Sequence, residues 1–399
     1  MKKIVFLFWL LMGSVSFTWA QDVAVTVSNH SRLQFERQTV ELPVCGKLPQ
    51  LGKQIVVLSH GEQIPYQFTY DGKLIFQVSV PPHQSERIII RKGVPNDFTV
   101  MATGRLHPER VDDMAWENDC IAFRCYGPAL QKTGEKSYGN DMWLKSTKQM
   151  ICDFRYGQEE RAHSDMALLL KAGKKAEARR YSDSISYHID HGNGMDNYSV
   201  GPTLGVGTTG FFLNGKILYP YCFSSYKVLD NGPIRFTVRL EYPVSFMDTE
   251  MKEVRVITLD AGSQLNKVSV FYLAQKEQLP VVVGLKQHVG SDNSGYSEKD
   301  GYAWCSEDNG KDGTTFTGIA FPKASKFSVL PLSDEERLAK SQETSGHLLA
   351  HFTVFNHQSL TYYWGGGWSK FGFPDKSDWI TYLSDFVYRL KAPLKVVVH

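Results

Sequence analysis

Short apolar runs rich in Val, Ile, Phe and Tyr recur along the chain, and most are bounded by Gly, Asn, Asp or Pro. Runs of this length and composition are typical of β-strands rather than helices. The clearest lie at residues 54–58, 73–80, 86–91, 121–126, 234–242, 252–259, 267–273 and 346–356. Asn214-Gly215, between residues 210–213 and 216–219, predicts a tight hairpin, because both positions tolerate positive φ. The pattern predicts an all-β fold built as a large antiparallel β-sandwich.

Helix signals are scarce in this sequence. One candidate helix begins with Ser164 or Asp165 as its cap and continues through residues 166–170 and 176–180. Gly173 predicts a break within it, because glycine disfavours helix interiors. We therefore expect one helical segment among many strands.

Residues 93–110 interrupt the strand pattern. Pro95 and Pro108 lie within this stretch, and proline marks turns and loops. We expect an N-terminal β-layer or small sandwich at residues 21–105, and a main β-sandwich with the active site at residues 106–399. The sequence leaves open whether these are two domains or one extended sandwich.

The first residues have the layout of a signal peptide. Lys2 and Lys3 precede an apolar run at residues 4–17, and Ala20 ends a segment of the kind that a signal peptidase cleaves. The apolar run is shorter than the roughly 20 residues that a membrane span needs. We expect a signal peptide at residues 1–20, no membrane anchor, and a periplasmic or secreted protein.

Charge and cysteine spacing argue against several functions. Residues 1–20 carry two of the 44 Lys and Arg residues and none of the 42 Asp and Glu residues, so the rest of the chain is formally neutral. A neutral chain without a basic stripe is not expected to bind nucleic acid. The six cysteines contain no C-x-x-C pair, which argues against a zinc ribbon or thioredoxin-like site and leaves their pairing open.

Residues 187–207 hold an unusually dense group of titratable side chains, mixed with glycines that let the backbone turn sharply. The group consists of Tyr187, His188, Asp190, His191, Asp196 and Tyr198. A histidine here could act as a general acid or base, with an aspartate orienting its other nitrogen. The same residues could instead bind a metal ion or cap turns. We favour the acid–base role and expect no metal and no cofactor.

A second polar segment precedes the strand predicted at residues 121–126. It consists of Trp116, Glu117, Asn118 and Asp119. Its position at the mouth of a strand favours ligand binding. Strand alternation places Arg124 on the face opposite Ile121 and Phe123, so if those two face the core, Arg124 faces solvent or lines a cleft. A solvated strand edge with a surface salt bridge is the alternative.

A third segment, near the C-terminus, combines aromatic residues with three consecutive glycines. It includes Trp364, Trp368 and Lys370. Aromatic rings on a flexible glycine loop would give flat platforms for sugar rings, although burial in the core is the alternative for several of them. His347 and His351 share one face of a predicted strand, and we expect them to be structural.

These segments resemble domain-of-unknown-function family 4861, whose members are secreted bacterial proteins found beside sugar-degrading enzymes in polysaccharide-utilisation gene clusters. The motifs that carry the resemblance lie at residues 116–119, 123–129, 187–207 and 231–235 and in the Tyr-Trp-Gly-Gly-Gly-Trp segment. The family pattern has arginine or a similar polar residue after Asp119, where this chain has Cys120. The resemblance implies a β-sandwich like those of galactose mutarotases and several polysaccharide lyases. It also implies an oligosaccharide dehydratase activity of the kind used in breakdown of the algal polysaccharide ulvan.

Such a dehydratase removes water from a terminal uronic acid and leaves a 4,5-unsaturated sugar. The reaction needs a base for the proton beside the carboxylate, a cation for the developing charge and an acid for the departing oxygen. His191 or His188 is then the expected base, Tyr198 the acid and Arg124 the carboxylate partner. The expected substrate-binding residues are Trp116, Glu117, Asn118, Asp119, Asp190, Asp196, Trp364, Trp368 and Lys370.

Two other functions stay open. A glycoside hydrolase would need two carboxylates roughly 5 to 10 Å apart, and the pairing to consider is Glu117 with Asp190 or Asp196. A non-catalytic glycan-binding protein would need the aromatic residues but not the titratable ones. We rank the lyase first, the hydrolase second and the binding protein third.

Overall fold

The computed structural model describes residues 22–399 except 47, 53, 275–277, 291–292, 334 and 338–343. The expected signal peptide lies outside the described residues. Within them, no helix is long and apolar enough to cross a membrane. All six cysteines fall in the described part of the chain, and none forms a disulfide.

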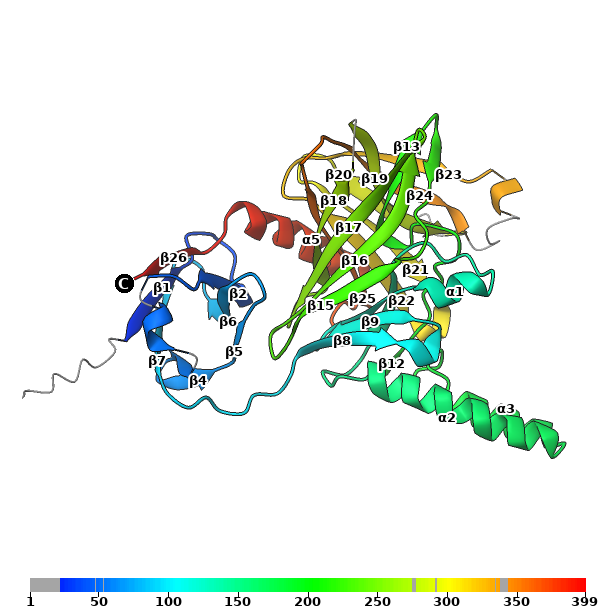
Figure 1. The fold of residues 1–399 in the computed structure, drawn as a ribbon, viewed down its shortest axis with the longest axis horizontal. Helices are drawn as coiled ribbons and strands as arrows, with labels where there is room; N and C mark the ends of the chain where they lie inside the picture. The colour runs from blue at the N-terminus through cyan, green and yellow to red at the C-terminus, as the bar shows by residue number, and fades with distance from the viewer. Residues whose placement is uncertain are drawn as a thin grey trace, which may run out of the picture.

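The N-terminal unit is a small β-sandwich, drawn in blue in Figure 1 except for one strand from the C-terminus, which is red. One sheet has the strand order β26-β1-β7-β3-β4 and the other β2-β6-β5. The strands are β1 Val23–Ser28, β2 Phe35–Pro43, β3 Ile55–Ser59, β4 Glu62–Ile64, β5 Tyr66–Phe68, β6 Lys73–Val80, β7 Ser85–Lys92 and β26 Lys395–Val398. β26 comes from the end of the chain and pairs antiparallel with β1, with Val398 opposite Val25. The main β-sandwich was expected to extend to residue 399. Instead, the last strand of the chain, β26, belongs to the sheet of the N-terminal unit.

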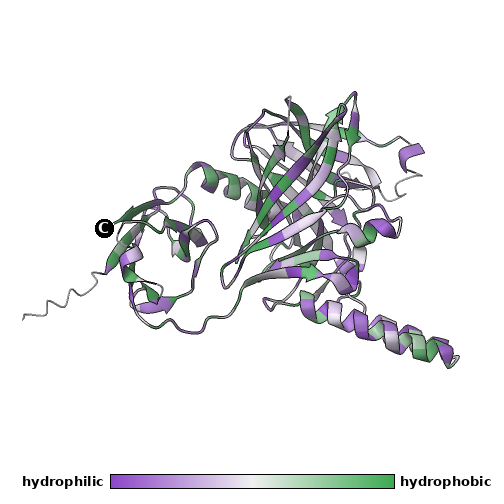
Figure 2. Ribbon diagram, in the orientation of Figure 1, coloured by the Kyte–Doolittle hydropathy of each residue, from purple (hydrophilic) through white to green (hydrophobic). Residues whose placement is uncertain are grey.

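The main unit contains three sheets, with the orders β12-β11-β10-β9-β8, β14-β13-β19-β24-β23 and β15-β16-β17-β18-β25-β22-β21-β20. Their strands are β8 Ala102–His107, β9 Asp113–Asn118, β10 Ile121–Cys125, β11 Asp141–Lys145, β12 Gly194–Met195, β13 Val206–Leu213, β14 Lys216–Leu218, β15 Ser225–Asn231, β16 Arg235–Phe246, β17 Thr249–Asp260, β18 Leu265–Leu273, β19 Leu279–His288, β20 Ser294–Ser297, β21 Tyr302–Asp308, β22 Thr314–Ala320, β23 Lys326–Pro331, β24 Thr344–Val354 and β25 Leu360–Trp368. One hydrophobic core, which includes Trp116, Leu285 and Trp364, connects all three sheets. Polar and apolar residues intermix along the strands in Figure 2, as expected where one face of a sheet is buried. The predicted all-β sandwich is confirmed.

The predicted turn at Asn214-Gly215 is also confirmed. It joins β13 to β14, and Leu213 pairs with Lys216 across it. Both turn residues have positive φ, 51° for Asn214 and 76° for Gly215. This backbone twist matches the right-handed twist of the flanking strands.

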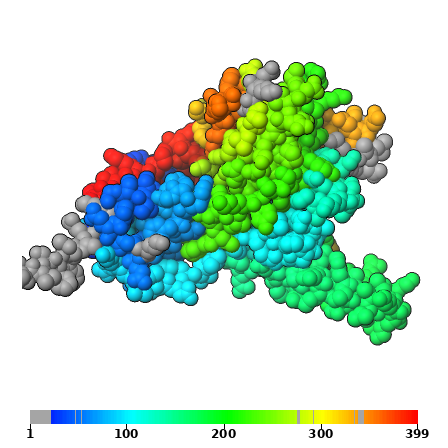
Figure 3. Space-filling view, in the orientation of Figure 1, coloured from blue at the N-terminus to red at the C-terminus, as the bar shows by residue number. Residues whose placement is uncertain are grey.

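The helices are α1 Pro128–Lys132, α2 Cys152–Lys171, α3 Lys175–Ile185 and α5 Lys376–Lys391. α2 and α3 form a helical hairpin that projects from the main unit (Figures 1 and 3). The predicted helix start at Ser164 or Asp165 is wrong, because α2 begins at Cys152. The Cys152 amide donates to the Glu117 carboxylate, so the group that caps this helix comes from a distant strand. The predicted break at Gly173 is confirmed, with φ +74°.

The sequence interpretation also missed α5. This helix has a local signal, because Asp375 and Asp378 form a capping box at its start. Its buried face carries Trp379, Leu383 and Val387, which pack against the outer face of the eight-stranded sheet.

The sequence predicted that the three consecutive glycines form a flexible loop. This prediction is wrong, because they lie inside β25. This strand pairs with β18 on one side and β22 on the other. A Cβ atom at Gly366 would collide with Met142, and one at Gly365 would collide with the Gln264 carbonyl oxygen. Close packing therefore explains why glycine occupies these positions, and a moving loop is not needed to explain them.

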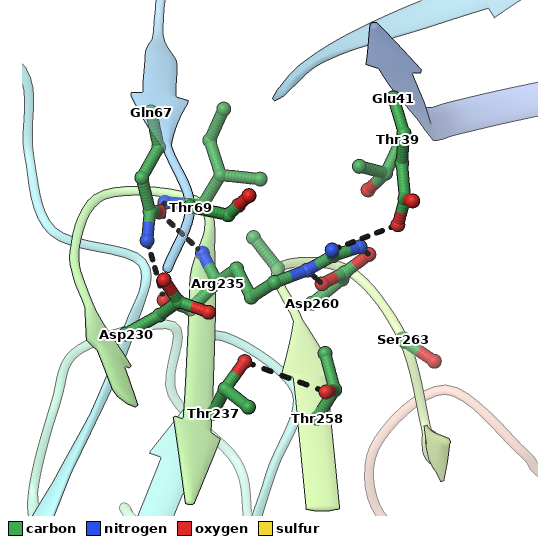
Figure 4. Close-up of polar contacts among 12 residues, drawn as sticks. Thr39, Glu41, Gln67, Thr69, Asp230, Arg235, Thr237, Thr258, Asp260 and Ser263 are labelled. Atoms are coloured by element: carbon green, nitrogen blue, oxygen red, sulfur yellow. Dashed lines mark hydrogen bonds and ion pairs between the residues drawn. The ribbon is translucent and has the colours of Figure 1, made fainter. Parts of the chain in front are cut away.

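Polar side chains join the two units, as Figure 4 shows. Arg235, at the start of β16, lies 2.7 Å from Glu41 of β2 and 2.6 Å from Asp260 of β17. Gln67 of β5 accepts a hydrogen bond from the Arg235 amide at 2.8 Å and donates one to the Arg235 carbonyl oxygen at 3.0 Å. The motif at residues 231–235 therefore holds the two units together.

Candidate active site

The two faces of the sheet that contains β9, β10 and β11 have different coverings. Ile121 and Phe123 point into the core of the main unit, which confirms the predicted alternation. Arg124 points to the opposite face, which is covered by α2 and by Tyr187. Arg124 neither faces solvent nor lies in a surface salt bridge, because only 5% of its surface is accessible.

Three aspartates and a tyrosine surround the Arg124 guanidinium. We call Arg124, Asp113, Asp141, Asp196 and Tyr126 the arginine cluster. Arg124 Nε donates to Asp141 Oδ2 at 2.9 Å, and Nη2 donates to the same oxygen and to Asp196 Oδ2, the latter at 3.0 Å. Asp113 Oδ2 lies 3.8 Å from Arg124 Nη1. The Tyr126 hydroxyl donates to Asp141 Oδ2 at 2.6 Å.

The arginine cluster holds more acidic than basic groups in a buried place. Burial raises the pKa of Asp113 to about 7, although Arg124 and Arg110 oppose the rise. Burial also raises the pKa of Asp196 to about 6, again against the effect of Arg124. For Arg124 itself burial acts to lower the pKa, but the surrounding acidic groups hold it well above its usual value. A permanent cation therefore lies beside carboxyl groups that exchange protons near neutral pH.

His188 lies at the exposed edge of the arginine cluster. Its Nδ1 is 2.8 Å from the Asp196 carbonyl oxygen, and only a protonated ring nitrogen can donate to a carbonyl. The neutral ring therefore carries its proton on Nδ1, which leaves the Nε2 lone pair available as a base. The His188 side chain is 63% accessible, so this nitrogen is open to a ligand.

A second cation, Arg110, stands at the same edge. Tyr187 and Asp113 raise the pKa of Arg110 against the opposing effect of burial, and the Tyr187 hydroxyl interacts with the guanidinium. The Tyr187 ring lies 4.5 Å from the His188 ring. Tyr187 therefore contacts a half-buried cation and an exposed base.

A family model described as "Domain of unknown function (DUF4861)" matches residues 27–396. The chain belongs to the DUF4861 family. It is 26% identical, over the whole length of both chains, to "Uncharacterized protein P7" of Formosa agariphila. The solved structures that it resembles include a protein in glycosyl hydrolase family 38 from Enterococcus faecalis, with 9% identity and a TM-score of 0.47, and an alpha-mannosidase from Enterococcus faecalis V583, with 11% identity and a TM-score of 0.48. In each comparison 95% of this chain is covered, but it spans only 47% and 46% of those two chains.

In this DUF4861 protein, His191 and Asp190 stabilise the loop that carries His188. His191 Nε2 lies 3.0 Å from the Ser186 carbonyl oxygen. Asp190 Oδ1 accepts from the amides of Gly192 and Gly194 at 2.9 and 3.1 Å. Neither side chain hydrogen bonds with the arginine cluster among the contacts that the described residues make.

Tyr198 lies inside the DUF4861 sandwich rather than at the exposed edge. Its ring is 5.6 Å from that of His288, whose Nδ1 is 2.9 Å from Glu307. The Tyr198 hydroxyl is buried and has no hydrogen-bond partner in the described part of the chain. Burial raises its pKa well above the usual value, so the hydroxyl keeps its proton.

Trp116 and Glu117, expected to bind substrate, are enclosed. Trp116 is fully buried, and its Nε1 donates to Asn266 at 2.8 Å. Glu117 accepts from Lys145 Nζ at 2.6 Å and from the Cys152 amide at 2.7 Å. Because 1% of Glu117 is accessible, it cannot form the expected hydrolase pair at a solvent-filled site.

Asn118 and Asp119 hold the turn that follows β17. Asn118 Nδ2 donates to the carbonyl oxygens of Asp260 and Ser263, each at 2.7 Å. Asp119 accepts from Arg37 of the N-terminal sandwich at 2.5 Å. This motif therefore supports the junction between the two units instead of the edge where His188 lies.

The expected aromatic platform is not exposed. Trp364 is fully buried, and its ring lies 5.0 Å from that of Phe123. Trp368 is also buried, and its Nε1 donates to the Asp312 carbonyl oxygen at 2.8 Å. Lys370 is exposed, with Nζ 5.3 Å from the centre of the Trp368 ring. β25 buries these rings because it lies within the eight-stranded sheet rather than at its edge.

The sequence interpretation missed Asp113, Asp141 and Tyr126. Asp113 and Asp141 are the first residues of β9 and β11, and Tyr126 directly follows β10. Their meeting depends on strand register, which places Asp141 opposite Arg124 and Met114 opposite Cys125. The polar residues at strand ends could have been noticed in the sequence as candidate site residues. The strand register that brings them together could not be predicted from the sequence.

Within the described residues, no group of three or more His, Cys, Asp and Glu side chains is placed to hold a metal ion. In the arginine cluster, the guanidinium occupies the position that a cation would take between the aspartates. Two hollows of ligand size lie elsewhere: one of about 770 Å³ at the junction of the two units, and one of about 530 Å³ beside β14.

Proposed function

We propose that this protein is a carbohydrate-active carbon–oxygen lyase. It removes water, or an alcohol, by β-elimination from the terminal uronic acid of an oligosaccharide and leaves a 4,5-unsaturated uronyl product. The observation that carries this proposal is the exposed His188, with its tautomer set by the Asp196 carbonyl, beside cations and proton-holding carboxyl groups. The resemblance of the chain's motifs to a family associated with polysaccharide breakdown supports the same substrate class.

Each group of the proposed site has one task. His188 Nε2 takes the proton from the carbon beside the uronate carboxylate, and the electron pair left behind forms the new double bond. Arg110, at the edge, and Arg124, within the cluster, stabilise the charge that develops on the carboxylate. The bond to the leaving oxygen breaks as that oxygen takes a proton.

Tyr126 replaces Tyr198 as the proposed acid. It is half-buried, and burial raises its pKa well above the usual value, so it holds its proton at neutral pH. Its oxygen lies 3.3 Å from Arg124 Nη2, which stabilises the phenolate after the proton has left.

The test uses two histidines of the same loop. Uronate-terminated oligosaccharides are incubated with the wild type, His188→Gln and His191→Gln, and the ultraviolet absorbance of the unsaturated uronate is followed. We expect His188→Gln to lower the rate about 100-fold or more, as loss of a general base does. His191→Gln is the matched control, because its ring is also exposed in the loop but is placed only to bind the Ser186 carbonyl.

The products separate this proposal from its rivals. Saturated sugars released at the same rate would make the protein a hydrolase, and binding without turnover would make it a glycan-binding protein. An absorbance rise that is unaffected in His188→Gln would refute the assigned base.

A further inference from the structure

A hollow beside β13, β14 and β16 has the size of a small-ligand site. Its volume is about 530 Å³, within the roughly 300–1,000 Å³ typical of such sites. Its lining includes the aromatic residues Tyr138, Tyr219, Tyr221 and Phe211, and the acidic residue Glu253. No Lys, Arg or His is among the described residues that line it. We call this cavity the tyrosine hollow.

The three tyrosine rings are held against one another by segments that are distant in sequence. The Tyr138 ring lies 5.6 Å from that of Tyr219 and 5.7 Å from that of Tyr221. Tyr138 belongs to the loop before β11, whereas the other two follow β14. Tyr221 is 37% exposed, which leaves part of its apolar ring open to solvent. Rings fixed in this way provide flat faces for the C–H groups of a sugar.

Glu253 adds a polar group to the lining of the tyrosine hollow. Glu253 is buried, and its Oε1 accepts from Thr209 Oγ1 at 2.6 Å and from Arg255 Nε. Arg255 is 2% accessible and stacks 3.8 Å from the centre of the Tyr242 ring. Its Nη1 and Nη2 are buried and have no hydrogen-bond partner in the part of the chain that the structure describes. Arg255 does not line the hollow, so it offsets the charge of Glu253 without adding a donor to the lining.

We infer that the tyrosine hollow binds a neutral pyranose unit of an oligosaccharide. The tyrosine rings stack on the sugar, and the Glu253 carboxylate accepts a hydrogen bond from one of its hydroxyl groups. The unit is neutral because no Lys, Arg or His among the described residues lines the hollow to pair with a uronate or sulfate group. This inference goes beyond the proposed lyase, since none of His188, Arg110 or the arginine cluster lines the hollow.

Calorimetric titration of the full chain tests the inference directly. The probes are neutral oligosaccharides of glucose, galactose, mannose, xylose or rhamnose, with oligogalacturonate as the anionic comparator. The double variant Tyr138→Ala/Tyr221→Ala should bind the preferred neutral sugar roughly tenfold more weakly, because two stacking rings are lost. Tyr70→Ala is the matched control, since Tyr70 is 53% exposed on the N-terminal sandwich and far from the hollow in sequence.

The expected result is a neutral sugar that binds the wild type, Tyr70→Ala and His188→Gln equally and the double variant weakly. Tyr221→Ala alone should also weaken binding without changing the thermal midpoint, which separates loss of a ring from loss of the fold. Absence of binding by every neutral probe, tighter binding of oligogalacturonate, or equal binding by the double variant would each overturn the inference. Because binding is measured in His188→Gln as well, these outcomes do not depend on the lyase proposal.

Discussion

Replacing Asp113 with asparagine removes one buried carboxyl group of the arginine cluster while keeping the side-chain shape. Burial raises the pKa of Asp113 from 3.8 to about 7. The folded protein therefore holds this proton to a higher pH than the unfolded chain does. The stability that comes from the protonated form is complete below the unfolded value of 3.8 and is lost as the pH rises towards 7.

The change in unfolding free energy follows from the pH range between the unfolded pKa of Asp113, 3.8, and its folded pKa of about 7. Each pKa unit corresponds to about 1.4 kcal/mol, and about two units of that range lie between pH 5 and pH 7. From about pH 5 to about pH 8 the wild type should therefore lose about 2–3 kcal/mol of unfolding free energy through Asp113. Asp113→Asn should not show this loss. The contribution of Asp196 is present in both proteins and largely cancels in the comparison.

Urea unfolding followed by tryptophan fluorescence, at about pH 5 and about pH 8, measures this difference. Asp248→Asn is the control, because Asp248 is exposed in the turn between β16 and β17. Its unfolding free energy should change with pH in parallel with the wild type. If Asp113→Asn also follows the wild type in parallel, the raised pKa of Asp113 is refuted.

Three further changes test the packing. Arg124→Met should lower the unfolding free energy by about 3–5 kcal/mol, because three buried aspartates lose their cation, and a loss of under about 1 kcal/mol by urea unfolding would contradict this. Deleting residues 395–399 should speed protease cleavage within residues 22–92, since β1 loses its edge partner; peptide mapping that shows an unchanged pattern would speak against it. Glu117→Ala should accelerate amide hydrogen exchange at Cys152, where Glu117→Gln should have a smaller effect, because only alanine removes the acceptor entirely.

The local sequence was sufficient to predict many of the strands and one tight turn. β6 occupies residues 73–80, as predicted, and β16, β17 and β18 overlap the predicted runs. These elements depend on apolar residues, β-branching and turn residues that are neighbours in sequence. Asn214-Gly215 was predictable for the same reason, since positive φ at two adjacent residues is a local requirement.

The tertiary structure decided which polar residues meet. Arg124 was singled out from strand alternation, but its partners Asp141 and Asp196 stand 17 and 72 positions away. Their contact depends on strand register and on the pairing of β12 with β11, which places Asp196 directly after β12, and no local pattern encodes either. The same limitation explains why His188 rather than His191 lies beside the cluster, although the two differ by only three positions.

Burial was likewise decided by neighbours that are distant in sequence. Trp364 and its glycines had the composition of an open loop, yet β25 lies between two other strands and its rings fill the core. The start of α2 depends on Glu117, and β1 has its edge covered by β26 from the other end of the chain. The sequence by itself determined many of the strands, because their signals are local. Only the tertiary structure decided the candidate site, because its residues are brought together by pairing and packing between segments far apart in the chain.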